Sequence, residues 1–390
     1  MSPNNALITG AALTPFNRRK DGSGFRDWAA QAFDAAISMA QIEPGDIDAL
    51  FVASESDFFS MQLNPAAVLA TELGLVGAAA TRCEGGGASG QVAVHAAIDS
   101  IRSGMSRHVA VVGVDPSASC LAPQTIRTLY GFSFDAWTDG FSGVSSTGLY
   151  ALSYQAFAAE LQTTDADLAS VTMQNRAHAC ENPGAHLPRQ DRAHDIMESP
   201  AISSPYRRLH CSPLSDGAAV LIISNAAKAP KARAKAPRVA GIGAGTDHMH
   251  LGARPAPGFF TAKAKAMARA CIQANIKPAE IGLAEIYDAY AGAQLQGLHA
   301  LGLSQNPARD LRRGDFAKDG RCPVNLSGGL MGQGAPVGAT GVGQTATIAL
   351  QLEGRYHPKL QLEDLPRYAL ADTHGGICTL AATTLLERGG

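Results

Sequence analysis

The chain has 390 residues, 46% hydrophobic and 17% charged, which predicts a globular, enzyme-sized protein with two domains or one large double unit. Its 32 basic and 34 acidic residues leave a net charge of −2, which argues against a nucleic-acid-binding surface. Seven scattered cysteines favour free thiols over disulfides or a zinc site, and without a leader pattern or a long apolar run we expect a cytoplasmic protein with no membrane span.

The first part of the chain alternates apolar strands with amphipathic helices. We expect strands at residues 6–10, 49–53 and 108–114, and helices at residues 25–40 and 64–74. This β-α-β order predicts an α/β fold.

A glycine-rich turn lies within residues 82–104, where Gly85, Gly86, Gly87 and Gly90 lead into a helical segment. Bare backbone N–H groups at the start of a helix suit an anion, which could be a phosphate or the oxygen of a thioester that becomes negative in a transition state. Close packing of a helix on a strand is the alternative explanation for such a turn.

The segment 116–206 breaks the regular pattern and contains helical stretches at 151–161 and 168–179. We interpret it as an inserted loop domain that carries substrate contacts or an oligomer interface. After a strand at 218–224, the basic run 225–237 is expected to be a solvated connector, with a nucleotide phosphate as its alternative partner. No metal-site spacing is found among the histidines of this region, which are His178, His186, His194 and His210.

Beyond this connector the plan of the first part repeats, and the segment Ile276–Ile281 copies the spacing of Ile42–Ile47 at an offset of 234 positions. Two halves, 1–230 and 231–390, would each supply one layered α/β unit, with the cleft where their glycine-rich turns converge. The expected elements of the second half are strands at 238–243, 283–287 and 368–371, helices at 261–274 and 342–352, and a glycine-rich run at 325–341.

Three motifs carry a resemblance to a known family. The segments Cys211–Ser224 (CSPLSDGAAVLIIS), Asn325–Gly341 (with NLSGG and GAPVGATG) and Thr373–Gly376 (THGG) resemble the thiolase superfamily, in its sterol-carrier-protein-2-like branch. The resemblance covers essentially the whole chain. It implies a duplicated five-layer α-β-α-β-α fold with an inserted loop domain, a homodimer, a CoA thioester as substrate and no separate cofactor.

The residues that thiolases use as nucleophile and histidine are replaced, because Gly87 stands at the cysteine position and Ala335 at the histidine position. Cys83 lies four residues upstream of Gly87 and is an atypical nucleophile candidate, with a buried strand-end thiol as the alternative. Ser89 has no base on its face and is a poor nucleophile. Substrate or oxyanion binding is expected at Gly86, Gly87, Ser89, Gly334, Ala335 and Gly338.

Tyr287 stands where the family has an asparagine or histidine, and a phenol there could transfer a proton without a covalent intermediate. Together with Gly87 it resembles the thiolase-like aldolases of steroid side-chain degradation, which cleave a β-hydroxyacyl-CoA by a retro-aldol reaction. Those proteins carry a second tyrosine that aligns with Ala335, so this chain departs from them there. A packed strand-end aromatic is the alternative for Tyr287. Asp288 and His374 are the other candidate catalytic residues, and His374 could instead cap the terminal glycine turn.

Three functions therefore stay open at the level of sequence. The first is a lyase of lipid metabolism in which Tyr287 takes the hydroxyl proton of a β-hydroxyacyl-CoA and the Cα–Cβ bond breaks. The second is an acyl-CoA acyltransferase or thiolase with Cys83 as nucleophile. The third is a catalytically silent thiolase-like subunit of a complex. The resemblance also implies a possible small OB-fold partner subunit of the DUF35 type.

Overall fold

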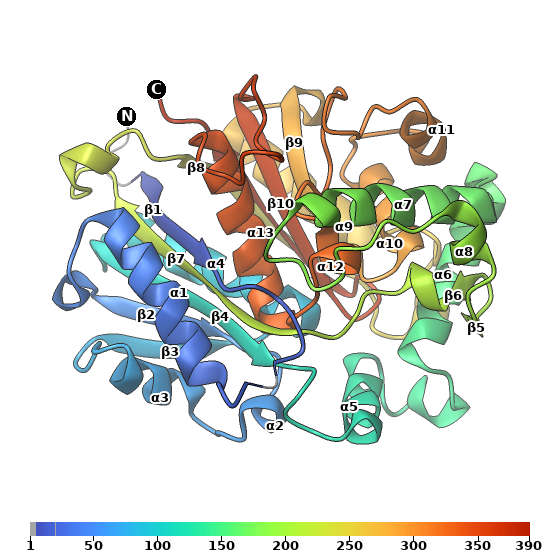
Figure 1. Ribbon diagram of the computed structural model, residues 1–390, viewed down its shortest axis with the longest axis horizontal. Helices are drawn as coiled ribbons and strands as arrows, with labels where there is room; N and C mark the ends of the chain where they lie inside the picture. The colour runs from blue at the N-terminus through green and yellow to red at the C-terminus, as the bar shows by residue number, and fades with distance from the viewer. Residues whose placement is uncertain (1–4, 20) are drawn as a thin grey trace.

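Nine strands form one mixed sheet in the computed structural model, which describes residues 5–19 and 21–390 (Figure 1). The order across the sheet is β3-β2-β4-β7-β1-β8-β11-β10-β9. The strands of the sheet are β1 (Ala6–Leu13), β2 (Ala49–Ala53), β3 (Ala79–Cys83), β4 (His108–Pro116), β7 (Asp216–Asn225), β8 (Arg238–Thr246), β9 (Ile281–Ile286), β10 (Tyr368–Gly375) and β11 (Leu380–Glu387).

The sheet consists of two halves that meet at one residue pair. β1 pairs with β7 along most of its length, whereas it pairs with β8 only through Leu7 and Arg238. In the first half β2 runs parallel to β3 and β4, and in the second half β9 runs parallel to β10. Parallel strands end at the same edge of a sheet, so each half brings the loops after its parallel strands together.

Helices form three layers around these half-sheets (Figure 1). The outer face of the first half is covered by α1 (Phe25–Ala40) and α3 (Pro65–Glu72). The outer face of the second half is covered by α9 (Thr261–Ala274), with α10 (Ala291–Ala300) beside it. Between the halves lie α4 (Ser89–Arg102) and α13 (Val337–Leu352), which contact strands of both. This is the α-β-α-β-α arrangement that the resemblance implied.

The middle layer is apolar because both of its surfaces are buried. Val94 of α4 and Val342 of α13 are fully buried in one cluster with Leu221 of β7 and Ala371 of β10. Almost every residue of α13 is buried, as expected for a helix that is packed on all sides. The layer thereby fixes the first turns of α4 and α13 against each other.

The remaining helices and short strands build the loop domain, drawn in green in Figure 1, and the connections around the sheet. α6 and α7 contact α10, and α7 also contacts α12, so the loop domain packs on the second half. These elements are α2 (Asp57–Ser60), α5 (Pro123–Tyr130), α6 (Ser146–Leu161), α7 (Asp165–Glu181), α8 (Ala193–Met197), β5 (Ala201–Ser203), β6 (Tyr206–Arg207), α11 (Pro307–Arg312) and α12 (Gly329–Gly332).

Several expected elements have other bounds in the structure; for example, the helix expected at 151–161 begins at Ser146. The helix expected at 342–352 already begins at Val337, directly after Pro336. The strand expected at 368–371 continues to Gly375, since Thr373 and His374 still pair with β11. The basic run at 225–237 is only partly a solvated connector, because Arg233 is buried and forms two hydrogen bonds with Glu353. Among the described residues, no helix is long and apolar enough to cross a membrane.

Candidate active site

The two glycine-rich turns meet at one cavity of about 520 Å³, which is within the size range of small-molecule sites. Gly87, before α4, and Ala335, before α13, both line it. Tyr287 follows β9 and His374 lies near the end of β10, and these parallel strands bring both side chains to the same cavity. Tyr150 reaches it from α6 of the loop domain. The cavity thus gathers residues from both halves and from the inserted domain.

The phenol of Tyr287 occupies the space beside Gly87. A Cβ atom added to Gly87 would lie 2.5 Å from the Tyr287 hydroxyl oxygen and 2.4 Å from the carbonyl oxygen of His374, and real Cβ atoms do not approach other atoms so closely. Tyr287 is 7% exposed, and burial, followed by the negative charge of Glu55, raises the pKa of its phenol. The phenol is therefore protonated at neutral pH and is equipped to donate a proton.

His374 is a neutral imidazole with one nitrogen free. Its Nε2 lies 2.8 Å from the Tyr150 hydroxyl, which donates to the Gly376 carbonyl oxygen at 2.6 Å. Because that hydroxyl has a single proton, Nε2 must carry the proton of the imidazole and donate it to Tyr150. Nδ1 is then an acceptor, and it has no hydrogen-bond partner among the described residues. Burial, with the charges of Lys263 and Arg254, holds the pKa of His374 well below its usual value.

One wall of the cavity is aromatic and largely apolar. The rings of Tyr150 and Tyr290 lie 4.5 Å apart, and Tyr290 exchanges a 2.9 Å hydrogen bond with Thr147. Apolar side chains on the remaining sides include Phe134, Leu214 and Leu330. Such a surface suits the hydrocarbon part of a substrate.

Asp288 is close to Tyr287 in sequence but does not line this cavity. Its carboxylate accepts hydrogen bonds from the backbone N–H groups of Leu330 (2.7 Å) and Met331 (3.3 Å) and from the Asn175 side chain (2.7 Å). These bonds fix the start of α12, which presents Leu330 to the cavity. Burial nevertheless raises the pKa of Asp288 to about 7. The contacts favour a role in positioning for this carboxylate.

In several of the expected oxyanion-binding residues, the polar groups are already hydrogen-bonded to other residues of the protein. The Ser89 hydroxyl donates to the Gly86 carbonyl oxygen at 2.7 Å and accepts from the Gly85 N–H at 3.0 Å, so it holds the turn together. The Gly338 N–H donates to Asp115 at 2.6 Å, and the Ala335 N–H donates to Ser215 at 3.0 Å. Gly334 has a φ of +121°, which a side chain would strain. The assignment of an oxyanion site to these turns stays a prediction.

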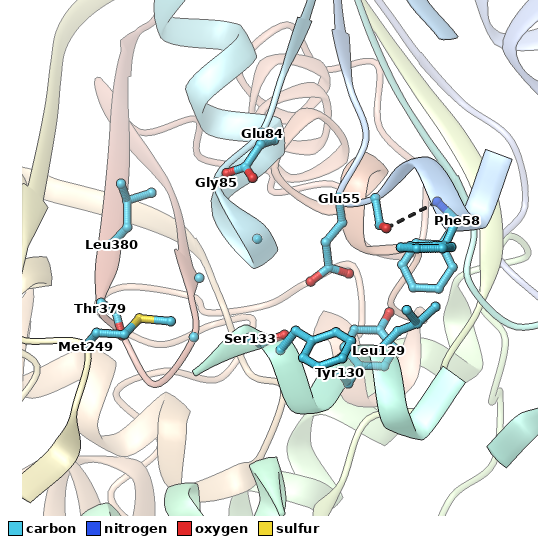
Figure 2. Close-up of a pocket in the computed structure, with 16 residues that line it drawn as sticks. Glu55, Phe58, Glu84, Gly85, Leu129, Tyr130, Ser133, Met249, Thr379 and Leu380 are labelled. Carbon is cyan, nitrogen blue, oxygen red and sulfur yellow. Dashed lines mark hydrogen bonds between the residues drawn. The ribbon is translucent and has the colours of Figure 1, made fainter. Parts of the chain in front are cut away.

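A second cavity of about 360 Å³ adjoins the first, and Glu55 borders both (Figure 2). Glu55 follows β2, and burial raises the pKa of its carboxyl to about 8. Glu84 lines only the second cavity, which also has apolar walls such as Phe58 and Leu380. The sequence analysis did not single out Glu55. Its position just after a strand that pairs in parallel was the sequence signal that could have identified Glu55.

The loop-domain histidines do not join this site. His178 contacts the Asn325 carbonyl oxygen at 2.9 Å, and His186 contacts the Ser215 hydroxyl at 2.7 Å. Among the described residues that line the larger cavity, His374 is the one histidine. Within the described part of the chain, no group of three or more His, Cys, Asp or Glu side chains is arranged to hold a metal ion.

Comparison with known proteins identifies the family of the chain. A family model described as "Thiolase, N-terminal domain" matches residues 6–185, and "Thiolase C-terminal domain-like" matches residues 243–388. The chain is 31% identical to an acetyl-CoA acetyltransferase of Methanothermobacter thermautotrophicus over 90% of this chain and 91% of the relative. The chain belongs to the thiolase superfamily.

Solved structures of thiolase-like proteins share the fold over the full length. The structure called "Ltp2-ChsH2(DUF35) aldolase" matches with a TM-score of 0.83 at 23% identity and covers 99% of this chain and 98% of that chain. The human mitochondrial 3-ketoacyl-CoA thiolase in complex with CoA matches with a TM-score of 0.76 at 15% identity over 100% and 99% of the two chains. At these identities the likeness establishes the fold.

The cysteines of this thiolase-superfamily chain are poorly placed or poorly ionised for attack on a substrate. Cys83 belongs to the apolar core cluster at the end of β3, lines neither cavity, and burial raises the pKa of its thiol to about 11. Cys211 does line the larger cavity, but burial raises the pKa of its thiol to about 12 and its Sγ donates to the Arg207 carbonyl oxygen. Thiolates, and not thiols, are the nucleophilic species.

Proposed function

We propose that this protein cleaves or forms a carbon–carbon bond in a CoA thioester without a covalent acyl-enzyme, by a retro-aldol reaction of a β-hydroxyacyl-CoA. The observation that carries the proposal is the phenol of Tyr287, which fills the space where a side chain at position 87 would lie. A thiolase reaction needs a nucleophile at that point, whereas a retro-aldol reaction needs only groups that move protons.

The reaction requires one proton to leave the β-hydroxyl and one proton to reach Cα. A base takes the hydroxyl proton, the Cα–Cβ bond breaks, and its electron pair becomes the enolate of a shorter acyl-CoA. Tyr287 then gives its proton to the far more basic Cα of the enolate; the raised pKa keeps this phenol protonated at neutral pH, so it cannot serve as the base of the first step. The sequence alone suggests that this phenol takes the hydroxyl proton, whereas its burial, which keeps it protonated, supports the opposite step proposed here.

Two further features support a lyase. The aromatic wall formed by Tyr150 and Tyr290 can hold the apolar part that leaves as an aldehyde or ketone. The Ltp2-ChsH2(DUF35) aldolase shares the fold over nearly the whole chain, and its name includes a DUF35 component. A small subunit of that type is therefore the partner to test first, and steroid-like or other ring-bearing acyl groups belong in the substrate panel.

The proposal is tested by incubating the protein, alone and with any co-purifying subunit, with linear, branched and ring-bearing β-hydroxyacyl-CoA substrates. We expect equal amounts of a shorter acyl-CoA and a free carbonyl compound, with one deuterium at Cα when the reaction runs in D2O. Intact-mass measurement should show no acyl adduct. An adduct on Cys83 or Cys211 would support the acyltransferase alternative, which the names of the sequence relatives favour. If no substrate is turned over, the remaining alternative is a catalytically silent subunit.

A further inference from the structure

Glu55 stands between the two cavities on a fixed segment of backbone. Its N–H donates to Asp115 at 3.0 Å, the neighbouring Ser54 hydroxyl donates to the same carboxylate at 3.0 Å, and Asp115 also accepts from the Gly338 N–H. These bonds tie the residues after β2 to β4 and to the first turn of α13. The backbone of Glu55 is therefore held beside the cleft by both halves of the fold.

The Glu55 carboxyl is sheltered and incompletely bonded. Its Oε2 is shielded from solvent and has no hydrogen-bond partner among the described residues. In Figure 2 the carboxyl extends into the pocket, on the side of Tyr130. Among the described residues, it is the one carboxyl that lines both cavities, and it shares the larger one with Tyr287. A carboxylate oxygen without a protein partner in a cavity of this size can accept a hydrogen bond or a proton from a substrate.

The groups that face Glu55 come from four different elements. Burial and the charges of Asp115 and Glu84 raise the pKa of Glu55, and the phenol of Tyr130 opposes them. Glu55 in turn raises the pKa of Tyr287. The positively charged Arg82 lies nearby, but it forms an ion pair with Asp57. The carboxyl is thus coupled to the phenol that donates to Cα.

We propose that Glu55 is the catalytic base that takes the β-hydroxyl proton and afterwards returns it to Tyr287, a role that rests on the lyase function proposed above. The Glu55 carboxylate accepts the hydroxyl proton as the Cα–Cβ bond breaks. Tyr287 delivers its own proton to Cα of the enolate and becomes a phenolate. The Glu55 carboxylic acid then protonates that phenolate. One proton has moved from oxygen to carbon, and both residues are restored.

His374 is the competing base, and its surroundings make it the weaker one. Its Nε2–H is committed to Tyr150, and its free Nδ1 is fully buried near the positive charge of Lys263. A cation formed there would be unfavourable. Glu55 also borders the second cavity, which His374 does not line.

The test compares the wild-type protein with Glu55→Gln, Glu84→Gln and Tyr287→Phe. Glu84 is a matched control because it lines only the second cavity and is exposed. We expect Glu55→Gln to lower kcat of the lyase reaction by at least about 100-fold with little change in KM, and Glu84→Gln to stay within about 3-fold. Wild-type kcat should rise with pH and level off above about 8, and Glu55→Gln should lack this rise.

Failure of this inference and failure of the proposed function give different results. An active wild type whose Glu55→Gln variant keeps its rate and its pH profile would overturn the role of Glu55 and leave the lyase standing. An equal loss in Glu84→Gln would also overturn it, because the effect would then be a general change of charge. A wild type that is inactive on every substrate would overturn both. Melting curves of the wild-type protein and of each variant between pH 5 and 8 check that every protein compared is folded.

Discussion

The Tyr287 hydroxyl oxygen lies 2.5 Å from the point that a Cβ atom on Gly87 would occupy, so these two positions cannot both carry a side chain at the cavity. The carbonyl oxygen of His374, 2.4 Å from the same point, closes the other side. A side-chain rotation could move the phenol, whereas the carbonyl belongs to β10 and cannot move without the sheet. Residue 87 is therefore confined to glycine by the backbone as well as by Tyr287.

Restoring a cysteine at position 87 should consequently fail to restore a thiolase. We expect Gly87→Cys and Gly87→Ala to lose about 1–3 kcal/mol of unfolding free energy through overpacking, and Gly87→Cys to form no acyl adduct with acyl-CoA. The comparison is Gly45→Ala, where an added Cβ meets nothing within 4 Å and stability should change little. Denaturant unfolding and intact mass give both answers, and a stable, acylated Gly87→Cys protein would contradict the geometry.

Tyr287→Phe should separate chemistry from folding. Removal of a proton-transfer group should lower kcat by roughly 10²- to 10⁴-fold while CoA-thioester binding and melting temperature stay nearly unchanged. Tyr154→Phe is the matched phenol control, since that hydroxyl bonds Thr163 and does not line the larger cavity. Its stability should fall by about 1 kcal/mol with kcat preserved. If Tyr287→Phe instead lost stability and kept its rate, the phenol would be structural.

Tyr150→Phe should affect the reaction through His374, whose ring lies 4.5 Å from that of Tyr287 and helps to position this phenol. The variant removes the hydroxyl that accepts from Nε2 and donates to Gly376, so the imidazole loses the contact that fixes its tautomer and orientation. We expect kcat to fall by about 10-fold and the pH profile to change, because either nitrogen can then carry the proton. NMR of the imidazole nitrogens reports the tautomer directly. An unchanged tautomer together with full activity would show that Tyr150 serves only as part of the aromatic wall.

Asp288→Asn tests whether that carboxylate is structural. In asparagine an NH2 group replaces one carboxylate oxygen, so either the Leu330 N–H or the Met331 N–H would meet a donor and lose its hydrogen bond. We therefore expect a loss of about 1–3 kcal/mol in unfolding free energy. Activity well below the melting temperature should change far less than in Tyr287→Phe. A large loss of kcat with an unchanged melting curve would show that Asp288 takes part in catalysis.

The sequence predicted most of the scaffold because apolar periodicity reports burial directly. The helix at 25–40 and the strand at 49–53 have the predicted bounds, since one face or both faces of these elements are packed. The bounds of β3 were not predicted, although Cys83 was interpreted as a possible strand-end thiol, because Ala79, Ala80 and Thr81 are exposed and carry no apolar pattern. Its place at the edge of the sheet comes from pairing with β2, which is a tertiary relation.

The motifs identified Gly87, Tyr287 and His374, but the sequence could not show how they are arranged. The rings of Tyr287 and His374 lie 4.5 Å apart, and this contact depends on the register of β9 with β10, in which Ile286 pairs with Asp372. Glu55 escaped notice because a single carboxyl after a strand is ordinary in sequence. Its partial burial between two cavities becomes visible only when the loop after β2 meets α5 and the turn before α4.

The pH dependence of stability should reflect the buried carboxyls of the cleft. Burial raises the pKa of Glu55 to about 8 and of Asp115, Glu285 and Asp288 to about 7, all above their unfolded values. The folded protein then binds more protons than the unfolded chain, so the stability from these groups is lost as pH rises from about 4 to 8.

Histidines act in the opposite direction over a lower range of pH. Burial lowers the pKa of His95 to about 4 and that of His374 well below 6.5, so their contribution is present above about 6.5 and is lost as pH falls. The two effects offset each other between about pH 4 and 6.5, and above that only the carboxyls remain. We expect the melting temperature to fall between pH 6.5 and 8.5, and to fall less in Glu55→Gln, which cannot ionise. Scanning calorimetry across this range measures both slopes, and a melting temperature that rises towards pH 8.5 would show that these carboxyls are already ionised in the folded protein.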